Sequence, residues 1–174
     1  ALIINEFGDL GMDSDILKGC GIKDCDLDGE RAGDIIELSN GCICCTVADE
    51  FVPTIEALLD RPEPPEHILI ETSGLALPKP LVKAFSWPEV RSKVTVDGVV
   101  AVIDADAVAA GRFADDEEAV QAQREADAAI DHDNPLEEVF TDQLNCADLI
   151  LLNKSDLMDA EAISKVKDEL GTQL

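Results

Sequence analysis

The alternation of short apolar runs with helix-like segments is the feature that most constrains the fold of this chain. Five runs are predicted to be strands, at residues 1–4, 34–38, 67–70, 98–103 and 148–152. The intervening and following segments are predicted to be helices, at residues 47–59, 81–85, 113–130, 136–146 and 160–170. Strands separated by helices pair in parallel through right-handed crossovers. The chain is therefore predicted to be a three-layer α/β domain, with helices on both faces of one mostly parallel sheet.

Two details of this pattern lead to further expectations. The run at 98–103 has no apolar–polar alternation, which indicates a strand covered on both faces. Gly171 is expected just past the end of the last helix, where glycine commonly terminates helices. In parallel α/β sheets, ligands bind beyond the carboxyl ends of the strands. Four polar clusters lie after predicted strands and are therefore candidate sites, at residues 5–9, 42–45, 71–74 and 153–156.

The charge of the chain excludes some classes of partner. Lys and Arg number 13 against 38 Asp and Glu, so the net charge is −25. Nucleic acid is not expected as a partner, because phosphate contacts along a polymer need many basic side chains. A single nucleotide is not excluded, because backbone N–H groups and one lysine can hold its phosphates. No apolar run approaches the ~20 residues of a membrane-spanning helix, so no membrane partner and a cytoplasmic location are expected.

The segment Asn153-Lys154-Ser155-Asp156 directly follows the last predicted strand. The carboxylate of Asp156 can accept hydrogen bonds from both the ring N–H and the amino group of guanine, a bidentate contact that discriminates between bases. Asn153 can bind the other edge of the base, and the stem of Lys154 can lie across the ring. The same residues would also suit an ordinary polar loop with an N-capping Asp. Their place after a buried strand favours guanine binding.

A second candidate site is Glu71-Thr72-Ser73-Gly74, at the end of another predicted strand. An acid in this position is suited to hold or orient Mg²⁺. Gly74 would let a backbone N–H approach a terminal phosphate. The alternative is a capped strand end with a solvated Glu71.

Three of the six cysteines, Cys42, Cys44 and Cys45, fall within four residues. Disulfides are rare in the cytoplasm, and thiolates are good ligands for Zn²⁺ and related metals. This spacing is not the paired pattern of a closed structural zinc site, so one loop would supply two or three ligands and leave the coordination open. Small buried residues in a tight loop and a redox thiol pair remain alternatives.

Taken together, these strings resemble the CobW family of P-loop GTPases in order and spacing. The resemblance rests on Ile4-Asn-Glu-Phe-Gly8, Ser39-Asn-Gly-Cys-Ile-Cys-Cys-Thr46, Ile70-Glu-Thr-Ser-Gly74 and Asn153-Lys-Ser-Asp156, and it covers nearly all of the chain. It implies GTP binding and slow GTP hydrolysis coupled to the handling of a divalent metal, Co²⁺ or Zn²⁺. The segment at 131–138 looks like the CobW proteins of cobalamin biosynthesis, which implies cobalt as cargo and a cobaltochelatase as the receiving enzyme.

The resemblance also assigns roles to residues. Glu6 and Asp9 would lie in the loop that senses the γ-phosphate and the metal. Cys42, Cys44 and Cys45 would be the metal thiols. Glu71 would be the acid on the Mg²⁺ side of the catalytic site, together with Gly74, while Asn153, Lys154 and Asp156 would bind the base.

The chain departs from the family pattern in one respect. Members carry a GxxxxGK[ST] loop upstream of Asn-Glu-Phe-Gly, and this sequence contains no such string. Residues 1–174 are therefore expected to form a partial GTPase domain without its first strand, phosphate-binding loop and first helix, and without the family's C-terminal domain. The intact protein would be a GTP hydrolase and this fragment inactive. A metal-binding or redox thiol module with no nucleotide role is the alternative.

Overall fold

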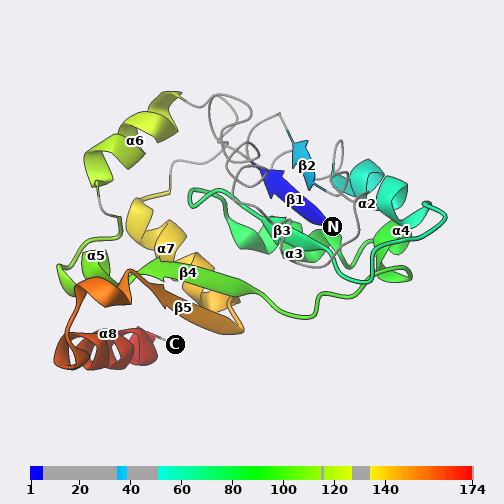
Figure 1. Ribbon diagram of the computed structural model, residues 1–174. Coiled ribbons are helices and arrows are strands. Elements are labelled where there is room, and N and C mark those ends of the chain that lie inside the picture. Colours follow the sequence, from blue (N-terminus) through cyan, green and yellow to red (C-terminus); the bar gives the residue numbers. More distant parts are fainter. Residues whose placement is uncertain (6–34, 39–50, 115, 127–133, 174) are drawn as a thin grey trace.

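The computed structural model describes residues 1–5, 35–38, 51–114, 116–126 and 134–173 (Figure 1). Its strands are β1 (Leu2–Asn5), β2 (Ile35–Leu38), β3 (Leu69–Glu71), β4 (Val100–Asp104) and β5 (Leu149–Asn153). Its helices are α2 (Val52–Leu59), α3 (Pro78–Ala84), α4 (Pro88–Arg91), α5 (Ala105–Ala109), α6 (Glu117–Ala126), α7 (Leu136–Cys146) and α8 (Ala160–Gln173), with a 3₁₀ turn η3 (Ser155–Leu157). The five predicted strands are all present, within two residues of their expected bounds.

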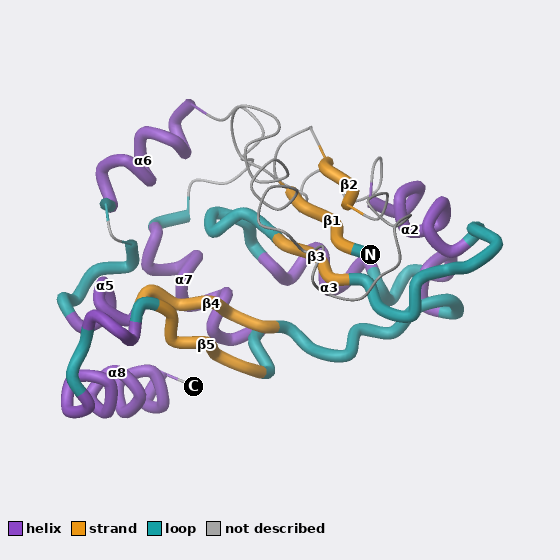
Figure 2. Tube along the Cα trace, viewed as in Figure 1, coloured by secondary structure: helices purple, strands orange, loops and turns teal. Residues whose placement is uncertain are grey.

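Every strand pair in the described residues is parallel, as predicted. The strands form a three-stranded sheet of order β2-β1-β3 and a two-stranded sheet of β4 and β5. Figure 2 shows the strands following one another across the molecule as β2, β1, β3, β4 and β5. The prediction of a single sheet is therefore wrong for the described residues: no described strand pairs with the outer edge of β3 or with the outer edge of β4.

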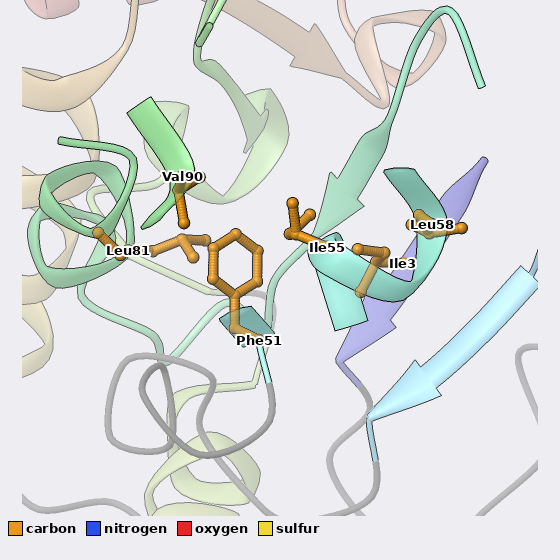
Figure 3. Packing of buried hydrophobic residues seen from close by; sticks show 7 residues of the cluster. Ile3, Phe51, Ile55, Leu58, Leu81 and Val90 are labelled. Atoms are coloured by element: carbon orange, nitrogen blue, oxygen red, sulfur yellow. The ribbon is translucent and has the colours of Figure 1, made fainter. Parts of the chain in front are cut away.

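The first core lies between the three-stranded sheet and helices α2, α3 and α4. Ile3 points toward α2, where Phe51, Ile55 and Leu58 follow the three- and four-residue spacing of one helix face (Figure 3). These four side chains are at most 1% exposed, and each contributes about 1.5–3 kcal/mol through burial. The ring of Phe51 also meets Phe85 edge-on at 5.2 Å between centroids. The amphipathic helix predicted for residues 47–59 is confirmed from Val52 onward.

The second core lies against one face of the two-stranded sheet. Ala101 and Ile103 of β4 pack with Phe140 and Leu144 of α7 and with Val166 of α8. Helix α7 has the bounds that its sequence predicts, because its apolar residues recur at helical spacing and Pro135 stands at its N-cap. The side chains of β4 and β5 that face this core are the alternate residues along each strand.

The opposite face of the two-stranded sheet is exposed. Val100, Val102, Leu149 and Leu151 have exposed fractions between 48% and 64%. Leu69 of β3 is 67% exposed as well. The expectation that the strand at 98–103 is covered on both faces is therefore wrong for the described part of the chain, although its composition is that of a doubly buried strand.

Several local expectations also need correction. Gly171 lies inside α8 rather than past its end, because the helix continues to Gln173. Helix α3 begins at Pro78, three residues before its expected start, because a proline fits the first helical turn, where its missing N–H removes no bond. The short helices α4 and α5 were not predicted. Within the described residues, no helix combines the length and the apolar character that crossing a membrane requires.

Candidate functional site

The carboxyl ends of the parallel strands carry the predicted site residues that the structure describes. Glu71 is the last residue of β3, and Asn153 is the last residue of β5. Lys154 follows at the N-cap of η3, and Asp156 lies within η3. In Figure 1 the arrowheads of β1, β4 and β5 point toward the same side of the molecule. Glu71 and the 153–156 turn belong to different sheets, so their assembly into one site stays a prediction.

The turn at 153–156 has an unusual backbone. Lys154 adopts the left-handed conformation, with φ 56° and ψ 22°, and it is the one non-glycine residue with positive φ among the described positions. Its carbonyl accepts a hydrogen bond from Leu157 N at 3.0 Å, which closes the 3₁₀ turn. Asn153 and Asp156 are exposed on either side of it. A left-handed lysine is uncommon and costs energy, so this conformation is held by its surroundings.

Asp104 is a site residue that the sequence reasoning missed. It ends β4 directly beside Asn153 in the β4–β5 register. Its Oδ2 lies 2.7 Å from Lys154 Nζ, and its Oδ1 accepts a hydrogen bond at 3.1 Å from Ala107 N in the first turn of α5. The Lys154 ammonium, together with that backbone donor, lowers the pKa of the Asp104 carboxyl. An acid between an apolar strand and an Ala-rich segment is the signal that the sequence offers, but Lys154, the partner of Asp104, lies 50 positions further along the chain.

The loop after β3 is held by α7. Gln143 Nε2 donates to the carbonyl of Gly74 at 2.8 Å and to that of Ala76 at 3.1 Å. Ser73 closes a turn at the same place, because its carbonyl accepts from Ala76 N at 2.9 Å and its Oγ accepts from Leu75 N at 3.2 Å. A Cβ at Gly74 would meet no atom within 4 Å, so packing does not explain the glycine.

An ion pair reinforces this contact between α3 and α7. Lys79 Nζ donates to Asp142, and this bond raises the pKa of Lys79. Cys146 ends α7 nearby, and burial raises the pKa of its thiol. Burial of this kind makes a thiol less reactive, because the thiolate is the reactive form.

The expected metal residues Glu6, Asp9, Cys42, Cys44 and Cys45 lie outside the described residues. Within the parts of the chain that the structure does describe, no group of three or more His, Cys, Asp or Glu residues is placed to hold a metal ion. The metal site therefore remains a prediction from sequence.

Comparison with known proteins extends the resemblance to the whole chain. Residues 1–173 match the nucleotide-binding domain of the CobW/HypB/UreG family. The chain is 62% identical over 172 residues to the "Zinc chaperone CobW" of Sinorhizobium sp, covering 99% of this chain and 47% of that protein. It is 53% identical over 174 residues to the "Zinc chaperone CobW" of Pseudomonas aeruginosa, covering 100% of this chain and 46% of that protein.

A more distant relative is the "Zinc-regulated GTPase metalloprotein activator 1" of Saccharomyces cerevisiae, with 32% identity over 98% of this chain and 38% of that protein. No solved structure matches the chain. The chain thus spans less than half the length of these curated relatives. The family match over residues 1–173 and the two close relatives agree with the strand-end motifs, and the chain belongs to the CobW/HypB/UreG family through its nucleotide-binding domain.

Proposed function

We propose that this chain is the guanine-nucleotide-binding part of a GTPase that delivers a divalent metal. The observation that carries the proposal is the turn after β5, where Asn153, Lys154 and Asp156 stand at the carboxyl end of a parallel strand and Lys154 is anchored to Asp104. The printed names of the relatives, zinc chaperones and a zinc-regulated GTPase, agree with it. A cytoplasmic location is part of the same proposal.

Base recognition is assigned to the exposed side chains of this turn. Asp156 would accept from the ring N–H and the amino group of guanine, and Asn153 would bind the opposite edge. Adenine lacks this pair of ring N–H and amino donors. It would therefore leave the carboxylate of Asp156 desolvated and unpaired, which disfavours its binding.

The phosphate side is assigned to the loop after β3. Glu71 is exposed at the carboxyl end of its strand, and a carboxylate there suits a hard cation such as Mg²⁺. Mg²⁺ bound at that point would neutralise phosphate charge during hydrolysis. Gly74 presents no side chain, and Gln143 fixes its carbonyl, so the backbone of this loop is held in place to approach a phosphate.

The metal cargo is assigned to Cys42, Cys44 and Cys45, with Glu6 and Asp9 as nearby acids in the loop that would respond to the γ-phosphate. Thiolates favour Zn²⁺ over Co²⁺ in the usual order of affinities, and zinc appears in the names of the relatives. Cobalt for cobalamin biosynthesis, delivered to a cobaltochelatase, is the cargo implied by the sequence resemblance. We take zinc as the first metal to test.

We further propose that this chain is part of a longer protein. The close relatives are about twice as long. In the described residues, β3 and β4 each have an edge without a partner strand, and one face of β4 and β5 is exposed and apolar. One further parallel strand between β3 and β4, followed by a helix across that face, would join the two sheets. Such a strand and helix would also bring the phosphate-binding loop that residues 1–174 lack, so the 174 residues alone are expected to be inactive.

Calorimetric titration with GTP and ATP tests the proposal. The longer protein should bind GTP and prefer it to ATP, while the 174-residue chain should bind GTP more weakly than about 0.1 mM, because each lost charge-assisted phosphate contact is worth about 1.5–3 kcal/mol. In the longer protein, Asp156→Ala should weaken GTP about 30-fold or more and leave ATP nearly unchanged. Asp168→Ala removes the same charge from an exposed site on α8 and should change neither. Absence of any guanine preference in the longer protein would favour a thiol metal-binding or redox module instead.

A further inference from the structure

The ion pair between Asp104 and Lys154 joins the ends of β4 and β5. The two strands run in register so that Asp104 is opposite Asn153, one residue before Lys154. The Asp104 backbone is well supported, since its neighbours Ile103 and Ala105 are 4% and 0% exposed. The Asp104 and Lys154 side chains are only 21% and 41% exposed, so the pair is less screened by water than a pair at the open surface.

The two carboxylate oxygens of Asp104 have different partners. Oδ1 caps α5 by accepting from Ala107 N, and Oδ2 holds the ammonium of Lys154. The cap needs only one acceptor oxygen, which Asn, Ser or Thr would supply equally well. Holding an ammonium favours a carboxylate, because the charge-assisted bond is about twice as strong as a neutral one. Helix capping alone therefore does not explain an aspartate at this position.

Lys154 needs such an anchor. A non-glycine residue is disfavoured in the left-handed region because of steric strain, and it persists there where its surroundings fix it. With the backbone fixed at the end of β5 and the ammonium fixed at the end of β4, the four-carbon stem of Lys154 spans the gap between the two strand ends. A stem held in this way would present apolar surface two residues before Asp156 in the chain, and a flat purine ring could lie on it.

We propose that Asp104 is a positioning residue that determines specificity for guanine by holding Lys154 as a fixed platform for the base. This inference rests on the proposed function. Asp104 does not touch the nucleotide; it acts through Lys154. A Lys154 side chain without this anchor would have to be ordered by the nucleotide itself, and that entropy cost would weaken binding and reduce the alignment of the base with Asp156.

The test uses the longer protein, fluorescently labelled GDP and unlabelled GDP and ADP as competitors. Asp104→Asn keeps the cap of α5 but removes the negative charge that pairs with Lys154. Lys154→Met keeps the apolar stem but removes the ammonium. Each should speed GDP release about fivefold and lower the preference for GDP over ADP, since an ion pair of this exposure is worth about 1 kcal/mol. Adding Asp104→Asn to Lys154→Met should cause no further change, because both remove the same interaction.

Glu56→Gln is the matched control, because it removes one carboxylate from an ion pair with Lys93 that lies outside the proposed nucleotide site and should not change GDP release. Thermal melting checks that Asp104→Asn remains folded. An unchanged rate of GDP release in the Asp104→Asn variant would overturn the positioning role. The role would also be overturned if Asp104→Asn had the same effect in the Lys154→Met background as in the unsubstituted protein, because Asp104 would then have a general structural role. If the unsubstituted protein showed no preference for guanine nucleotides, the proposed function would be wrong, and so would the inference that rests on it.

Discussion

At the scale of single residues, the candidate site depends on side chains that lie far apart in the sequence. Lys154, in its left-handed conformation, forms an ion pair with Asp104, and the Gly74 carbonyl accepts a hydrogen bond from Gln143. In both cases the sequence identifies one partner through its motif, and tertiary structure supplies the other. A strand-end motif is therefore recognisable from sequence, whereas the residues that orient it become visible only once the strands are in register.

The metal prediction also belongs to this scale. In the longer protein, Co²⁺ should give the intense thiolate-to-metal absorption of a tetrahedral site, and GTP with Mg²⁺ should strengthen it. Cys42→Ala or Cys44→Ala should abolish the band, because thiolate ligands generate it. Binding should also strengthen from pH 6 to 8, because the thiols must lose their protons.

Cys146→Ala is the control for this measurement, since Cys146 belongs to no group of three or more His, Cys, Asp or Glu residues placed to hold a metal in the described part of the chain. If the thiolate-to-metal absorption band survived the loss of both Cys42 and Cys44, these cysteines would have a structural or redox role rather than a metal-binding one.

At the scale of elements, α7 connects the two candidate halves of the site. Its Asp142 and Gln143 contact α3 and the loop after β3, and its C-terminal end leads into β5 and the base-binding turn. Helix α7 also carries Phe140 and Leu144 of the second core. One helix therefore supports the predicted phosphate loop and precedes the strand, β5, at whose far end the predicted base site lies.

Gln143→Ala tests this support. Loss of its amide leaves the carbonyls of Gly74 and Ala76 without that donor, and because the bond to Gly74 is exposed to water, the free energy of unfolding should fall by only about 0.5–1.5 kcal/mol. Hydrogen exchange should also become faster at the amides of Leu75 and Ala76, which close the turn on Ser73. Asn145→Ala, at an exposed position of the same helix, should change neither measurement. Unchanged exchange in the Gln143 variant would show that the turn holds its shape without α7.

Much of the fold could be predicted because the physical signals are local. Apolar runs located all five strands, and helical spacing located α7 and the described part of the 47–59 helix. The short helices α4 and α5 escaped because four or five residues carry too little periodicity, and their starts depend on Pro88 and on the Asp104 cap. Glycine commonly terminates helices, so the sequence predicts a helix end at Gly171, yet α8 continues through it. Whether strands join one sheet or two depends on which strand lies between them, and no local pattern carries that information.

At the scale of the whole molecule, composition and exposure disagree along β4 and β5. These strands have the apolar composition of strands covered on both faces, but Val100, Val102, Leu149 and Leu151 are exposed in the described chain. A contiguous apolar face of this kind marks a surface that packs against something. The proposal that a helix of a longer protein covers it explains why the run at 98–103 has the sequence pattern of a strand buried on both faces.

Val102→Asp distinguishes a covered face from an open one, because the same substitution should act in opposite ways in the two forms of the protein. In the 174-residue chain, the charge would break up an exposed apolar surface, so self-association in sedimentation velocity and binding of a hydrophobic dye should both fall. In the longer protein, the charge would be buried under the covering helix without a partner, and the free energy of unfolding should drop by about 3 kcal/mol or more. Val96→Asp, at a half-exposed loop position, should have little effect in either form. Equal, small effects of Val102→Asp in both forms would mean that the face stays open in the longer protein and that the two sheets are not joined across it.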